Sequence, residues 1–600
     1  MWAVFFTTGL VLAIVIISVR NRGSASTAEF YLAGRRVGLL ANASAICGDY
    51  FSAASFLGVA GAVYASGLDG LWFGAGFGAG FVPVLLFFAS PIRRFGEYTL
   101  PDFLAARFQS STARVAGVLA VQAVALSYLA PQMLGAGTTW EVLVGHGLAG
   151  LDGYSTGVVV TAVLMAVYVG LGGMRGTTWN QMVQFWVLLS AIGLVVLLGL
   201  GYGFSYARAL ADVSRPPLTV PTAFTVHDLL AVDPRSGERP ADAARRVMSE
   251  TYWKDKIAPR LQDPEARVVV LMPQRSQLTG EVMRFNQAGH RYGWLDQFSV
   301  VLTLVLGTSG LPHIMNRFYT NPTGRVARLT TVYVLGFASL FYMLASMVGV
   351  IGRELVPGLV AAGGRGAVDQ AVSGVLVNSD AIVPFLGQTL GGSAGLGYVA
   401  AGAFAAMVST IGGLLMASAA SWGHDLYEQF LEPDAPEWKR IAVGRLAVLF
   451  MSALALAVGL AVRAMGLTRA YPALIAQMVT WAFAISGSSF VPVLVTAIWW
   501  KRTTLRGALA GLLVGGLGSV GFIILNILRV TNSDPVYQAT IWYQAGMLTY
   551  PTVITAPLAL GVVVAVSSLD RKLPGNINEI WVRIHGTARE RAERRAGSES

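Results

Sequence analysis

Apolar stretches of about 20 residues recur from one end of this chain to the other. At 1.5 Å of rise per residue, a helix of that length crosses the hydrocarbon core of a bilayer. Of the 600 residues, 54% are hydrophobic and only 12% are charged, whereas a soluble domain carries about 25% charged residues. The sequence therefore predicts a polytopic membrane protein with thirteen spans, at 2–19, 39–64, 70–90, 115–143, 155–174, 180–205, 294–312, 329–352, 391–421, 441–466, 473–498, 507–530 and 547–569.

The arginines of the short loops predict an orientation. Arg35 and Arg36 follow the first span, Arg93 and Arg94 follow the third, and Arg175 follows the fifth. These clusters all lie on one side if the N-terminus is outside and the C-terminus is cytoplasmic, as expected of a multi-pass plasma-membrane protein. The same arrangement accounts for the net charge of +11, so we expect a lipid bilayer and no nucleic acid as partner.

Residues 1–37 are expected to form the first membrane helix and a cytoplasmic loop. Two other segments are expected to lie outside the membrane in bulk, and the first of them, residues 206–293, forms a long extracellular loop. The apolar run RVVVLMP at 267–273 suggests a strand within that loop. Residues 570–600 form a cytoplasmic basic tail, which we expect to be solvated or to lie on the membrane surface.

Motifs of soluble enzymes are absent, which argues against an enzyme and against an organic cofactor. The chain contains no GxxxxGK[ST], HExxH or CxxC pattern. What it contains are polar and glycine-rich interruptions of apolar helices, at 45–58, 305–318 and 401–427. Non-helical backbone at membrane depth occurs where it lines a cavity or is buried in protein, and transporters use it to bind ions and substrates. Each interruption alone is also compatible with ordinary close packing of helices.

Six motifs in this order resemble the sodium:solute symporter family, and within it the cation/acetate branch that carries short monocarboxylates. They are GDYFSAASFLG at 48–58, SGLDGLWFGAGFGAG at 66–80, APQMLGAG at 130–137, GGMRGTTWNQMVQ at 172–184, GTSGLPHIMNRF at 307–318 and STIGGLLMASAASWGHDLY at 409–427. The resemblance implies an all-α fold whose core is two inverted five-helix repeats, each beginning with a broken helix. The repeats would span 38–205 and 294–500, and residues 501–569 would add two peripheral helices.

The resemblance also implies where the coupling sodium ion binds. In the family the ion lies between the first broken helix and the eighth core helix. The matching positions are the carbonyls of Gly48, Phe51 and Ala406 and the hydroxyls of Ser409 and Thr410. Neutral oxygens of this kind suit a sodium ion that must be released again, because they do not trap it electrostatically.

A short carboxylate substrate needs hydrogen-bond donors. We expect the second interruption to supply them from backbone N–H groups freed at Gly307 and Gly310 and from the hydroxyls of Thr308 and Ser309. Tyr128 and Gln132 of the fourth span are candidate side-chain donors. His313 is expected to have a structural or gating role.

Asp49 lies inside the first interruption, where a lone acid at the centre of a membrane helix costs about 2.5–3.5 kcal/mol. One interpretation is a negative charge on the cation path that tunes sodium affinity or gating. The other is a buried ion pair with an arginine such as Arg317. Some family members carry their acid at the next position, where this chain has Tyr50, so their aspartate's role is not transferred here.

The sequence leaves alternatives open. The substrate could be pyruvate, propionate or an amino acid in place of acetate, and the coupling ion could be a proton. A transporter-like sensor or a passive channel would be a different class of protein. The segment after residue 570 is too short to fold as a signalling domain, and a channel would need no sodium gradient.

Overall fold

The computed structural model describes residues 2–21, 26–233, 237–276, 279–287, 294–362, 371–467, 474–532, 534–570, 572–575, 577–586 and 590. Within these residues, nine helices are long and apolar enough to cross a membrane, and a bent pair makes a tenth. Two of the nine are double spans, because Ala54–Phe95 and Gly153–Gly201 each cover parts of two predicted spans. With the apolar helix α1, every one of the thirteen predicted spans falls on a helix or on one half of a helix.

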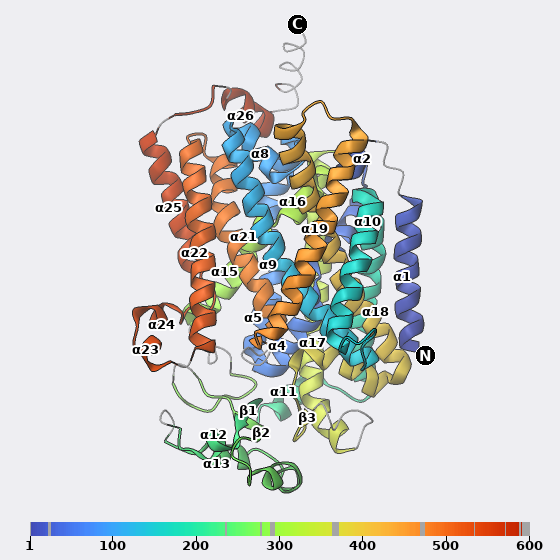
Figure 1. Cartoon of the computed structure of the whole chain (residues 1–600), viewed down its shortest axis with the longest axis vertical. Helices are drawn as coiled ribbons and strands as arrows, with labels where there is room; N and C mark the ends of the chain where they lie inside the picture. The colour runs from blue at the N-terminus through green and yellow to red at the C-terminus, as the bar shows by residue number, and fades with distance from the viewer. Residues whose placement is uncertain are drawn as a thin grey trace.

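Most helices of the membrane region run roughly along one common direction (Figure 1). Their bounds are α1 (Trp2–Arg20), α3 (Leu39–Tyr50), α4 (Val59–Ser66), α5 (Leu71–Ala79), α7 (Ala89–Phe95), α9 (Ser111–Val144), α10 (Gly153–Gly201), α15 (Trp294–Gly310), α16 (Pro312–Tyr319), α17 (Gly324–Ala361), α18 (Ile382–Ala420), α19 (Glu437–Ala464), α21 (Leu474–Trp499), α22 (Leu505–Thr531) and α25 (Thr552–Asp570).

Glycines divide two of these helices. Gly173 has φ 54° inside α10, and Gly392 has φ 61° inside α18. Side chains other than glycine rarely adopt such positive φ values, so a glycine is the residue expected at each break. The break at Gly173 separates the predicted spans 155–174 and 180–205, and the break at Gly392 starts the predicted span 391–421.

The centre of the bundle is formed by α18 and α21. The apolar window of α18 is buried along its whole length, and that of α21 is buried nearly completely. By contrast, α22 and α25 bury about a third of theirs and lie at the periphery, opposite α1 (Figure 1). A helix that is apolar on all sides and surrounded by protein is available to bind an ion or a solute away from lipid.

One end of the molecule carries a small element built from residues of the predicted extracellular loop (Figure 1). Strands β1 (Thr219–Thr225) and β2 (Arg267–Pro273) pair antiparallel, which confirms the strand predicted at 267–273. The short helices of this element are α11 (Tyr206–Val213), α12 (Val226–Leu230) and α13 (Pro240–Arg245). A second small hairpin, β3 (Ala371–Val372) with β4 (Val375–Leu376), lies at the same end.

This outer element is tied to the helix bundle. Arg353 of α17 donates hydrogen bonds to the backbone and hydroxyl oxygens of Thr219, at 3.2 and 3.1 Å. The N–H of Leu68, just after α4, donates to the carbonyl of Phe285 at 2.9 Å. A Cβ at Gly67 would lie 2.3 Å from that same carbonyl, so glycine allows the loop to approach.

The opposite end carries α2 (Thr27–Leu32), α8 (Leu100–Phe108) and α26 (Ile577–His585) (Figure 1). Part of the expected solvated tail is therefore docked on the protein. The side chains of Ile577, Ile580 and Ile584 are buried, and Arg583 pairs with Glu97 at 2.8 Å. Residues 591–600 lie outside the described residues. The first residues of α1 and α26 lie at opposite ends of the bundle, as an odd number of spans requires, whereas the orientation in the cell stays a prediction.

Candidate functional site

The first broken helix is interrupted where α3 ends. Its last residue is Tyr50, Phe51 has φ −79° and ψ 78°, and helix resumes in the wide turn Ala54–Gly58 that leads into α4. The N–H of Ser52 donates to the carbonyl of Tyr50 at 2.9 Å instead of to that of Gly48. The carbonyls of Gly48 and Phe51 thus flank the interruption. Glycine is needed at 48, because a Cβ there would lie 2.3 Å from the carbonyl oxygen of Gln181.

The predicted sodium ligands of α18 face this interruption. The hydroxyls of Ser409 and Thr410 donate to the carbonyl of Ala406 at 3.0 and 3.1 Å. The Thr410 hydroxyl also lies 2.7 Å from the carbonyl of Asp49, between Gly48 and the end of α3. This hydrogen bond joins α18 to the end of α3 between the predicted ligands Gly48 and Phe51, and all five predicted residues are buried. This set of neutral oxygens at a helix break fits a sodium ion.

Asp49 forms a fully buried ion pair with Arg317 of α16. The guanidinium Nε lies 3.2 Å from the carboxylate, and both side chains have no exposed surface. Of the two interpretations offered by the sequence, the pair with Arg317 is the one seen. The carboxylate faces the arginine, while the backbone carbonyl of the same residue accepts from Thr410. Arg317 thereby neutralises the charge of Asp49 next to the predicted ion site, and the carboxylate does not occupy that site.

Arg317 connects this pair to α10. It donates to the hydroxyl of Thr178 at 2.8 Å and to the side-chain oxygen of Gln181. The amide nitrogen of Gln181 in turn donates to the carbonyl of Ser409 at 2.7 Å. Sequence reasoning missed Thr178 and Gln181 as site residues. A signal was present, because both are polar residues inside an apolar helix.

The second broken helix differs from its prediction. Helix α15 runs without interruption through Gly310, and the break falls at Leu311, before Pro312, with a bend of 41°. The N–H groups of Gly307–Gly310 are therefore not freed, because they lie in helical backbone. Both glycines serve packing: a Cβ would lie 2.5 Å from Phe483 at 307 and 2.6 Å from the Ser486 carbonyl at 310.

The two hydroxyls between these glycines are also already bonded. Thr308 donates to the carbonyl of Leu304 at 2.7 Å and shares a 2.8 Å hydrogen bond with the hydroxyl of Tyr50. Ser309 donates to the carbonyl of Val305 at 3.4 Å. Thr308 does face the end of α3, as expected, but through Tyr50. The expected set of free donors at 307–310 is not formed.

Unpaired donors lie instead beside the break of α3. We call Ser52, Tyr128, Gln132 and His313 the polar cluster. The side-chain oxygen of Gln132 accepts from the N–H of Ala53 at 3.0 Å, which fixes α9 against the break. The ring of Tyr128 lies 5.5 Å from that of His313, and its hydroxyl lies near that of Ser52.

All four members of the polar cluster are buried. Within the described part of the chain, the amide nitrogen of Gln132 and both ring nitrogens of His313 have no hydrogen-bond partner, and the hydroxyls of Ser52 and Tyr128 have none other than each other. Most buried polar groups in proteins are paired, so several unpaired ones at one place mark it as a candidate binding site. Tyr128 and Gln132 were predicted as substrate donors. Ser52 and His313 were not.

Three ligand-type side chains also gather at the end that carries α8. Asp102, His424 and Asp425 could in principle hold a metal ion. Arg114 already pairs with both carboxylates, at 2.7 and 3.2 Å, and His424 pairs with Glu428 at 3.0 Å. Burial raises the pKa of Asp102, but its hydrogen bond to His424 and the charges of His424 and Arg114 outweigh burial and hold that pKa below its usual value. This cluster is therefore an ion-pair network that joins α8 and α9 to the end of α18.

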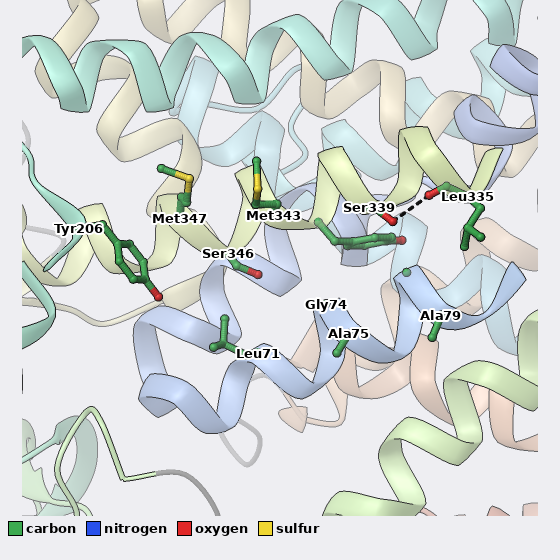
Figure 2. Close-up of a pocket in the computed structure, with 12 residues that line it drawn as sticks. Leu71, Gly74, Ala75, Ala79, Tyr206, Leu335, Ser339, Met343, Ser346 and Met347 are labelled. Atoms are coloured by element: carbon green, nitrogen blue, oxygen red, sulfur yellow. Dashed lines mark hydrogen bonds between the residues drawn. The ribbon is translucent and has the colours of Figure 1, made fainter. Parts of the chain in front are cut away.

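A groove of about 720 Å³ runs between α5 and α17 (Figure 2). Small residues of α5, such as Gly74 and Ala75, face Ser346 and Met343 of α17 across it. Met343 is 55% exposed, so the groove opens on the outer surface of the bundle. No predicted sodium ligand and no member of the polar cluster lines it. The candidate site is therefore the break of α3 and not this groove.

Comparison with known proteins identifies a family and a related fold. The profile of the sodium:solute symporter family matches residues 30–213 and 275–515. A solved structure of a Na⁺-coupled sialic acid symporter, in a substrate-bound outward-open state, superimposes with a TM-score of 0.60 at 14% identity, covering 95% of this chain and 98% of that one. Mhp1, a nucleobase-cation-symport-1 family transporter, gives a TM-score of 0.46 at 11% identity, covering 94% and 100%.

The likeness to the sialic acid symporter concerns the fold alone. It confirms the all-α polytopic architecture predicted from the sequence, with two inverted five-helix repeats and two broken helices. At this identity, the substrate of that protein says nothing about the solute bound here.

Proposed function

Because the chain belongs to the sodium:solute symporter family, we propose that it couples the inward movement of sodium to the uptake of a small monocarboxylate such as acetate. Membership makes it a sodium-coupled solute symporter of the membrane and not an enzyme. The proposal adds the chemical class of the solute, the residues that bind it and the residues that bind the ion.

The polar cluster is the observation that carries the proposal. Its hydroxyls, its amide and the N–H of a neutral imidazole are donors, and a carboxylate is a strong acceptor for all of them. The nearest acid, Asp49, is already paired with Arg317 and does not oppose an anion. The ring of Phe483 lies 5.5 Å from that of Tyr128, which supports a small solute.

The proposed ion site lies on the other side of the same break. The carbonyls of Gly48, Phe51 and Ala406 and the hydroxyls of Ser409 and Thr410 would hold sodium, while Ser52 and the N–H of Ala53 belong to the substrate side. Binding of sodium would order the backbone at the break of α3, and the same backbone carries residues that bind the solute. Each ligand would therefore favour binding of the other, which is positive coupling.

The proposal is tested by uptake into proteoliposomes that contain the purified full chain. The panel comprises labelled acetate, propionate, pyruvate and a neutral amino acid, each with an imposed sodium gradient or an imposed proton gradient. We expect saturable acetate uptake that requires inward sodium. Uptake driven by protons in the absence of sodium would contradict sodium coupling, and downhill flux without either gradient would indicate a channel. Transport of the amino acid alone would remove the monocarboxylate assignment.

The substrate assignment predicts a specific effect of Tyr128→Phe. This change deletes one hydroxyl of the polar cluster and keeps the ring that packs on His313. We expect the binding free energy of the carboxylate to weaken by about 1.5–3 kcal/mol, the usual value of a hydrogen bond to a charged group. The measurement is the half-saturating solute concentration at fixed, saturating sodium.

Ser127→Ala is the matched control, because it deletes a neighbouring hydroxyl of α9 that is exposed and bonded to its own helix. It should leave uptake unchanged. Wild-type solute affinity in a well-expressed Tyr128→Phe protein would show that the carboxylate binds elsewhere.

A further inference from the structure

A second cavity, of about 580 Å³, lies where α2, the start of α3 and α10 meet. Figure 1 shows α2 beside α10 at the end of the bundle opposite to the β1–β2 hairpin. The cavity is lined by Arg36, Gly38, Arg175, Thr178 and Trp179, among others. It is separate from the polar cluster, none of whose members line it.

The lining carries two cations without counter-ions. Arg36 and Arg175 have no ion-pair or hydrogen-bond partner within the described residues, and both are exposed. Glu29 is the one acid among the lining residues. Both arginines belong to the loops that the charge distribution assigns to the cytoplasmic side. Two arginines without counter-ions around a cavity favour the binding of an anion, because guanidinium groups bind phosphate oxygens with two parallel hydrogen bonds.

Two helix beginnings at the cavity add to this preference. Helix α3 begins after Gly38 without a side-chain cap, and α10 starts again after the break at Gly173, next to Arg175. The first N–H groups of a helix have no intrahelical partner and carry partial positive charge. Together with the two arginines, they give the cavity several donors, against the single carboxylate of Glu29 in its walls.

Apolar side chains border the same cavity. Trp179, which is 48% exposed, lines it together with Val37 and Met182. Tryptophan is enriched where a membrane protein crosses the headgroup region of the bilayer. A free phosphate ion gains nothing from these side chains, whereas a lipid brings acyl chains to them. We propose that this cavity binds the phosphate of an anionic phospholipid headgroup on the cytoplasmic leaflet, with Arg36 and Arg175 as its ligands.

The site is connected to the ion-pair network of the transport centre. Thr178 lines the cavity, and its hydroxyl accepts from Arg317, which pairs with Asp49. A bound headgroup therefore lies one side chain away from the residue that joins α3, α10 and α16. Lipid binding is expected to stabilise the arrangement of these helices seen here.

The test measures binding and is independent of which solute is carried. The full chain in detergent is titrated with dioctanoyl phosphatidylglycerol, dioctanoyl phosphatidylcholine or inorganic phosphate, and its thermal unfolding midpoint is recorded. We expect a saturable rise with phosphatidylglycerol only. Arg36→Gln with Arg175→Gln should raise the half-saturating lipid concentration at least about tenfold, since each surface cation contributes on the order of one factor of five.

Arg325→Gln with Arg328→Gln is the matched control, because it removes the same charge from exposed positions of the same predicted face. It should leave the titration unchanged. An equal loss in this control, or equal stabilisation by phosphatidylcholine, overturns the proposal. Saturation by inorganic phosphate at the same concentration overturns the lipid assignment in favour of a free anion. If the double variant does not fold, the same titration is made with Trp179→Ala, which should weaken the binding of the lipid.

Discussion

Arg317→Gln should destabilise the folded protein by about 3–5 kcal/mol, because it leaves the buried carboxylate of Asp49 without its partner. It also removes the donor to Thr178 and to the side-chain oxygen of Gln181. We expect a large fall in the thermal unfolding midpoint in detergent and a loss of sodium-dependent uptake. Asp49→Asn should have a comparable effect, because it leaves a buried guanidinium uncompensated.

The double variant distinguishes an ion pair from two independent packing positions. Asp49→Asn combined with Arg317→Gln restores neutrality in a site where a carboxamide can still bond a carboxamide. Its midpoint should lie above that of either single variant. Additive losses would show that the two charges do not interact in the membrane, and Arg325→Gln serves as the control for removing an exposed arginine.

Ser409→Ala with Thr410→Ala should raise the sodium concentration for half-maximal uptake at least about tenfold, which corresponds to about 1.4 kcal/mol. The Thr410 hydroxyl contacts the end of α3, the Ser409 hydroxyl bonds the proposed ligand carbonyl of Ala406, and their loss removes two of the five oxygens proposed to hold the ion. The apparent affinity for the solute, measured at saturating sodium, should change far less. Uptake is measured against sodium concentration at fixed solute.

Thr389→Ala is the control for this pair. Thr389 also lies on α18 and donates to its own helix, at 2.8 Å, but it precedes the break at Gly392. Its removal should not affect the sodium requirement. An unchanged sodium requirement in the Ser409 and Thr410 double variant, at normal expression, would exclude these hydroxyls as ligands.

Local sequence patterns predicted most of the fold because they act over short distances. Apolar runs predicted the thirteen spans, and the β-branched run at 267–273 predicted the strand that pairs with 219–225. The break of α3 could be located because its motif is specific. The break of the second broken helix was placed too early, because Gly307 and Gly310 look like helix breakers but relieve contact with α21.

The site could be predicted only in part, because its contacts join residues far apart in the chain. The ion pair of Asp49 and Arg317 was one of two interpretations of the sequence. The two residues are 268 positions apart in the chain, and only the structure shows that they lie side by side. Ser52 lay within a recognised motif, yet nothing in the sequence shows that its hydroxyl has no partner other than that of Tyr128. His313 was assigned to structure or gating, and its contact with Tyr128 depends on the bend after Gly310.

The outer β1–β2 element is bonded to the first broken helix, so a ligand of this element could act on that helix. Its Thr219 is bonded to α17, the adjoining Phe285 to the residues just after α4, and the hydroxyl of Tyr64 in α4 accepts from Leu376 of the second hairpin at 3.0 Å. An antibody fragment bound to this element would restrain α4 from outside without entering the solute path. It would report on the conformational state that it recognises, would slow transport by stabilising that state, and would serve as a fiducial for imaging.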